Sequence, residues 1–146
     1  INERVFSLLL YMRSLANKKF LIQTRLAEHE IFKDVIKGDI SGFYRKELSM
    51  RKNLGYPPFS KFIKLTRESI HQNLAQKEIA IIKEQLKKYS PIDFPAFISK
   101  VKNKYRWNLL LKVEPKTWPD KYPELASFLQ NLGPQWRVEI DPENLL

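Results

Sequence analysis

Over residues 59–146, the spacing of the apolar residues changes repeatedly between two periods, and this pattern constrains the fold more than any other feature. Alternation at every second residue predicts strands, whereas spacings of three and four residues predict amphipathic helices. The segments follow one another in the order β-α-β-β-α-β. The expected strands cover residues 59–67, 94–101, 106–113 and 136–140, with helices after the first and third strands.

This order is typical of the split β-α-β architecture, in which two helices cover one face of a four-stranded sheet. The third strand shows the pattern most clearly, because Trp107, Leu109, Leu111 and Val113 all fall on one face. The opposite face of the sheet is left open to solvent or to a partner. The predicted fold class is therefore α+β.

Residues 1–58 are predicted to be mostly helical, with one short strand at Lys18–Thr24. Gly38 stands where a left-handed residue commonly ends a helix, and Asp39 or Ser41 can cap the next helix. The expected helices cover residues 1–16, 27–37, and 39 or 41 to 53.

The segment Leu54–Phe59 (LGYPPF) separates these two parts of the chain. Gly55 can end a helix, and the two prolines that follow Tyr56 cannot continue one. We therefore expect two domains, residues 1–58 and residues 59–146.

The positive charge of the chain indicates which kinds of molecule it could bind. The chain has 26 lysines and arginines against 16 aspartates and glutamates, a formal net charge of +10. This excess indicates a polyanionic partner, such as nucleic acid, an anionic membrane surface or an acidic protein tail. The apolar run Val5–Met12 is too short to span a bilayer, so we expect a cytoplasmic protein without a membrane partner. Because the chain begins at Ile1, we expect it to be part of a longer polypeptide.

The densest positive patch lies in residues 94–113, which contain five basic residues and no acidic one. Lys102, Asn103 and Lys104 fall at the predicted tip of a β-hairpin. Basic and aromatic side chains together can bind phosphates and stack on bases. The alternative is a solvated hairpin end, whose lysines only keep the strand edge soluble. The candidate DNA-binding residues are Lys100, Lys102, Lys104, Tyr105 and Arg106.

A second candidate site could bind an acidic partner tail. It combines basic side chains with an aromatic one, around the segment that precedes the last helix, and its residues are Lys112, Lys116, Trp118 and Lys121. A further basic group is either an ordinary polar face or the lining of a groove. That group comprises Arg45, Lys46, Arg51, Lys52, Lys61, Lys64 and Arg67.

No catalytic or metal-binding pattern is found in the sequence. The absence of cysteine excludes zinc fingers and thiol nucleophiles, and His29 and His71 lack the spacing of zinc ligands. The sequence has neither a G-x-S-x-G elbow nor a phosphate-binding G-x-x-x-x-G-K-[ST] loop. We therefore predict no catalytic, cofactor-binding or metal-binding residues, and we do not expect this chain to be an enzyme.

Four stretches of the sequence match a known family in order and spacing. They are Phe20–Thr24 with His29, Phe43–Phe59, Lys104–Lys112 and Trp136–Pro142. They resemble the C-terminal region of the PriA family of primosomal replication-restart DNA helicases (primosomal protein N prime). The Gly-Tyr-Pro-Pro-Phe segment is the most specific of them, and the resemblance covers nearly the whole chain.

The resemblance implies that the two parts of the chain correspond to different domains of the parent protein. Residues 1–58 would be the tail of the second helicase lobe with its exit helices, and residues 59–146 the C-terminal domain. In the family, this domain helps to bind branched and single-stranded DNA. With the helicase lobe, it also helps to form a pocket for the acidic tail of single-stranded DNA-binding protein. The resemblance therefore implies a bacterial, nucleoid-associated role in the primosome.

One motif departs from the family pattern. The two arginines of helicase motif VI would fall on Leu15 and Lys18. Leucine cannot stabilise the charge of a transferred phosphoryl group, and lysine lacks the bidentate geometry of arginine. The family's ATP-binding, magnesium-binding and zinc-binding motifs lie outside this chain. ATP, Mg²⁺ and Zn²⁺ are therefore expected only in the parent protein.

Overall fold

The computed structural model describes residues 2–143 and 145, with only the backbone of Ser99. The chain divides into two compact units, Ile1–Leu54 and Gly55–Leu146, called unit 1 and unit 2 below. This division falls four residues before the expected boundary after residue 58. Tyr56 accounts for the difference, because its ring packs edge-on against Phe62 of unit 2, with ring centroids 5.4 Å apart.

Unit 1 contains the helices α1 (Asn2–Ser14), α2 (Glu30–Lys37) and α3 (Ile40–Leu54). Gly38 is left-handed (φ 71°), as expected for the end of α2. Asp39 caps α3, since its carboxylate Oδ1 accepts a hydrogen bond of 2.8 Å from the Gly42 N–H. The core of unit 1 is built around the stacked rings of Phe6 and Phe43, and it also includes Leu9, Ile31 and Val35.

The expected strand at Lys18–Thr24 is wrong: this segment is an irregular connection between α1 and α2. The alternation that suggested it does correspond to burial, because Phe20 and Ile22 pack against the core of unit 1 while Leu21 is exposed. A strand also needs a neighbour that accepts and donates backbone hydrogen bonds. Within the described part of unit 1, no second extended segment supplies them.

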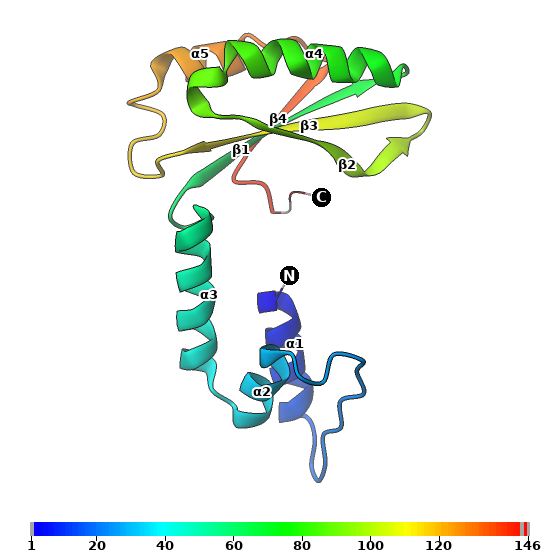
Figure 1. The fold of residues 1–146 in the computed structure, drawn as a ribbon, viewed down its shortest axis with the longest axis vertical. Helices are drawn as coiled ribbons and strands as arrows, with labels where there is room; N and C mark the ends of the chain where they lie inside the picture. The colour runs from blue at the N-terminus through cyan, green and yellow to red at the C-terminus, as the bar shows by residue number, and fades with distance from the viewer. Residues whose placement is uncertain (1, 144, 146) are drawn as a thin grey trace. The chain divides into compact units, whose positions relative to one another are not determined.

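Unit 2 has the expected order of elements and forms one antiparallel sheet with the strand order β2-β3-β1-β4 (Figure 1). Each β-α-β half is split, because an antiparallel strand lies between its two strands. This confirms the predicted α+β fold. The elements are β1 (Lys61–Ser69), α4 (Gln72–Gln85), the 3₁₀ turn η1 (Lys87–Tyr89), β2 (Ile92–Val101), β3 (Lys104–Val113), α5 (Pro123–Gln130) and β4 (Trp136–Ile140).

Both helices of unit 2 lie along the same face of the sheet (Figure 1). Ile79 of α4 and Leu125 of α5 join one buried cluster with alternate residues of β1 and β3, such as Leu65 and Leu109. Burial of these side chains stabilises the unit by roughly 1.5–3 kcal/mol for each large aliphatic residue. None of the described helices is long and apolar enough to cross a membrane.

Strand β2 lies at the edge of the sheet and contains a large irregularity. Pro95 pairs with Trp107, and Lys100 pairs with Tyr105. Residues 96–99 therefore face a single residue of β3, Arg106. The bulged strand bends near the hairpin end, as Figure 1 shows. The sequence pattern predicted a regular strand here.

Candidate nucleic-acid interface

The tip of the β2–β3 hairpin is a two-residue turn. Lys102 (φ 48°) and Asn103 (φ 60°) both have left-handed backbone conformations, the combination that a type I′ turn requires. This turn matches the twist of the two strands and holds the tip in a defined position. Lys102 and Lys104 are exposed there, as the sequence predicted.

Lys100 and Tyr105 form a pair across the two strands just behind the tip. The Nζ atom of Lys100 lies over the ring of Tyr105, 5.1 Å from its centroid, in a cation–π contact. One face of the Tyr105 ring is therefore covered by the chain's own lysine. Stacking of a base on that face requires Lys100 to swing away.

Arg106 differs from Lys100, Lys102 and Lys104 because it already forms an ion pair. Its Nε atom lies 2.6 Å from the Oε1 atom of Glu68 on β1. Since successive residues of a strand point to opposite faces, Arg106 also lies on the other face of β3 from Tyr105. The five candidate DNA-binding residues thus share one hairpin but are divided between its two faces.

The three lysines at the hairpin tip differ from many other cations of the chain, because no carboxylate of a described residue neutralises them. Lys100, Lys102 and Lys104 form no ion pair with any carboxylate in the described part of the chain. By contrast, the second basic group predicted from the sequence is largely neutralised. Its ion pairs are Lys46–Asp34, Arg51–Glu47, Lys61–Asp141, Lys64–Glu139 and Arg67–Glu78.

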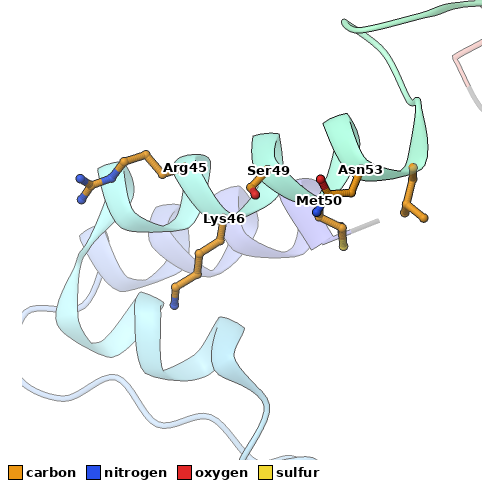
Figure 2. A pocket seen from close by; sticks show the side chains of 6 residues that line it. Arg45, Lys46, Ser49, Met50 and Asn53 are labelled. Atoms are coloured by element: carbon orange, nitrogen blue, oxygen red, sulfur yellow. The ribbon is translucent and has the colours of Figure 1, made fainter.

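Part of that second group lines an open hollow of about 630 Å³ along α3. Figure 2 shows that Lys46 points from α3 towards α2, where it meets the buried carboxylate of Asp34 at 3.1 Å. The hydrogen bond with Asp34 raises the pKa of Lys46 above its usual value, against the opposing effect of burial. The lining residues are Arg45, Lys46, Ser49, Met50, Asn53 and Leu54.

The structure does not gather the second candidate site, the one for an acidic tail, at one place. The Nζ atom of Lys112 lies 5.6 Å from the ring centroid of Phe62, on the face of the sheet opposite the helices. Trp118 instead packs against the core on the helix face, next to Tyr122. The connection between β3 and α5 carries Lys116 and Lys121, both exposed.

Sequence reasoning missed two features of the hairpin: the bulge at residues 96–99 and the role of Glu68. Both depend on strand register, which brings Glu68 opposite Arg106 although 38 residues separate them. No local pattern in the sequence predicts that pairing.

Among the described residues, no three acidic or histidine side chains gather where a metal ion could bind.

Comparison with known proteins identifies the family of the chain. The model of the primosomal protein N (PriA) C-terminal domain matches residues 52–143, more than half of the chain. This chain belongs to the PriA family. The match begins on the last turn of α3 and includes the whole sheet of unit 2, so the PriA resemblance of the sequence is confirmed.

Individual PriA relatives extend the similarity to most of the chain. The replication restart protein PriA of Thermotoga maritima is 32% identical over 130 residues, which cover 87% of this chain and 17% of that protein. The PriA protein of Chlamydia pneumoniae is 28% identical over 159 residues, covering 97% of this chain and 21% of that protein. The chain therefore spans about a fifth of the length of these PriA relatives.

Proposed function

We propose that this chain is the DNA-binding C-terminal region of a PriA-like replication restart protein, and that it contacts forked or single-stranded DNA through the β2–β3 hairpin. In this proposal Lys100, Lys102 and Lys104 bind phosphates. Tyr105 stacks on a base once Lys100 has moved. Arg106 joins the phosphate contacts when DNA displaces it from Glu68. The parent protein would be an ATP-dependent helicase, and this chain would contribute binding rather than hydrolysis.

The observation that carries the proposal is the charge of the hairpin. Lys100, Lys102 and Lys104 are exposed at or beside the two-residue turn and form no ion pair with a described carboxylate. Binding to DNA phosphates releases counterions, which favours such unpaired cations over those already held in ion pairs. Phosphate contacts carry no sequence information, so the expected preference is for DNA structure rather than sequence.

Fluorescence anisotropy with labelled forked DNA over a salt series tests this proposal. The double variant Lys102→Ala, Lys104→Ala should bind more weakly. The plot of log K against log salt should become less steep by about 1.4, or ~0.7 for each lost contact to a single strand. The matched control is Lys52→Ala, Lys77→Ala, which removes the same charge from two exposed helix positions. Equal effects of the two variants, or affinity that does not respond to salt, would overturn the proposal.

A second candidate function is binding of the acidic tail of single-stranded DNA-binding protein. The observation in its favour is that two exposed lysines, Lys116 and Lys121, stand on either side of half-buried Trp118 in the sequence. Titration of the ¹⁵N-labelled chain with an acidic peptide ending in phenylalanine tests it. Chemical-shift changes of the amide signals centred on Lys116 support this function, and an unchanged NMR spectrum excludes it.

A further inference from the structure

The bulge of β2 presents an apolar surface beside the hairpin lysines. Phe97 is 78% exposed, more than any other described phenylalanine, tyrosine or tryptophan, and the neighbouring Ile98 is 62% exposed. Both belong to the segment 96–99 that faces the single residue Arg106. Because four residues occupy the space of one, the strand is pushed out of the ladder and these side chains leave the pattern of alternate burial.

Exposure of this kind at a sheet edge is unfavourable unless something covers it. An exposed apolar edge strand promotes association with other chains. The charges around the bulge indicate which partner covers this one. Lys100, Lys102 and Lys104 follow directly along the hairpin, and the nearest acidic residue in register, Glu68, is held by Arg106. An apolar surface next to unpaired cations matches the alternation of bases and phosphates in a nucleic acid strand.

We propose that Phe97 and Ile98 form a contact site for unpaired DNA bases, with the adjacent lysines holding the phosphates. This inference rests on the proposed function and names side chains of the hairpin that would contact bases rather than phosphates. Bases within a duplex are stacked on both faces, whereas unpaired bases expose a face on which an aromatic ring can stack. The site therefore selects single-stranded regions and the junctions of forks over continuous duplex.

Two probes separate contacts to bases from contacts to phosphates. One is labelled oligothymidylate, and the other is a labelled strand of the same length made of abasic deoxyribose phosphates. The variant Phe97→Ala, Ile98→Ala should bind oligothymidylate about tenfold or more weakly, the loss of roughly one base stack. Its binding to the abasic strand should stay unchanged. Because both side chains are exposed, the variant should keep the thermal melting curve of the original chain.

Three further variants serve as controls. Ile81→Ala removes an apolar side chain of similar exposure from α4 and should change neither affinity. Phe97→Trp keeps an aromatic face and should retain binding of oligothymidylate. The double variant Lys102→Ala, Lys104→Ala should weaken binding of both probes.

The outcomes distinguish this inference from the proposed function. The Phe97 and Ile98 variant could bind both probes like the original chain, or its affinity for both could fall equally. Either result would contradict the base-contact site and leave the proposed lysine contacts standing. If the original chain binds neither probe, the proposed function fails as well. If the variant instead abolishes a dimer of the free chain in sedimentation velocity, the patch joins two copies of the chain and the inference is overturned.

Discussion

The Nε atom of Arg106 lies 2.6 Å from the Oε1 atom of Glu68, its register partner on β1. About a third of each side chain is exposed, so the pair contributes only modestly to stability. Its larger consequence is electrostatic. In the free chain, the one arginine of the hairpin is already bound to a carboxylate, and DNA phosphate has to compete with Glu68 for it.

Replacing Glu68 with glutamine should therefore strengthen DNA binding. We expect affinity for forked DNA to rise about two- to fivefold, the equivalent of ~0.5–1 kcal/mol for a partly exposed ion pair. Fluorescence anisotropy at moderate salt measures the change. Glu124→Gln is the control, because it removes one negative charge from the ion pair that joins α5 to Lys88 of η1. Equal gains in both variants would mean that net charge alone governs binding.

The buried hydrogen bond between Thr66 and Asn108 should stabilise the centre of the sheet. The Thr66 hydroxyl donates to the Asn108 Oδ1 atom at 2.8 Å, and both side chains are buried. Asn108→Ala leaves the hydroxyl without this partner and should cost about 1–3 kcal/mol. Urea denaturation measures the loss. In a double-mutant cycle with Thr66→Val, the combined loss should be smaller than the sum of the two single losses.

The core of unit 2 should be sensitive to cavities. Leu109 is fully buried between the sheet and its helices. Leu109→Ala should lower the free energy of unfolding by about 2–5 kcal/mol, whereas Ile92→Ala at a half-exposed position should cost less than about 1 kcal/mol. Chemical denaturation of the two variants gives this comparison. Similar losses in both would show that the cluster around Leu109 does not dominate stability.

Acid should weaken the contact between β2 and α4. A hydrogen bond from Lys83, aided by one from the Trp107 indole, lowers the pKa of Asp93 below its usual 3.8 against the effect of burial. A carboxyl whose pKa is lowered by folding adds stability above its unfolded pKa and loses it as the pH falls through the folded pKa. Asp93→Asn should therefore cost ~0.5–1 kcal/mol at neutral pH, after allowance for solvent screening.

This cost should shrink below pH 3.8 and disappear once Asp93 is protonated in both states. Denaturation curves of both proteins at a series of pH values measure it. A difference that persists unchanged in acid would show that Asp93 acts through packing rather than through its charge.

Unit 2 should fold without unit 1. Its main hydrophobic cluster draws only on residues between Ile63 and Val138. A fragment of residues 55–146 should therefore melt in one cooperative transition by circular dichroism and keep the hairpin's affinity for DNA. A fragment starting at residue 61 would test the role of Tyr56, whose ring packs on Phe62. Loss of cooperativity in the longer fragment would contradict this prediction.

Much of unit 2 was predictable because local and tertiary preferences agree there. The alternation at residues 106–113 and the helical spacing around Ile79 each specify both an element and its buried face. At Lys18–Thr24 the alternation correctly indicates which side chains are buried, yet no strand forms. Burial of alternate side chains is a local property, whereas a strand also needs a hydrogen-bonding neighbour.

The candidate interface also has some features that depend on local sequence and others that depend on neighbouring strands. The sequence alone shows that residues 94–113 contain five basic residues and no acidic one, and it predicts that Lys102 stands at a turn. Which of these cations remain available depends on the folded sheet, because register places Glu68 against Arg106 and leaves Lys102 and Lys104 without a described acidic partner. The exposure of Phe97 likewise follows from the bulge in the folded sheet. The reason is that charge pairing and strand bulges depend on which residues meet across the sheet, and local spacing does not encode those meetings.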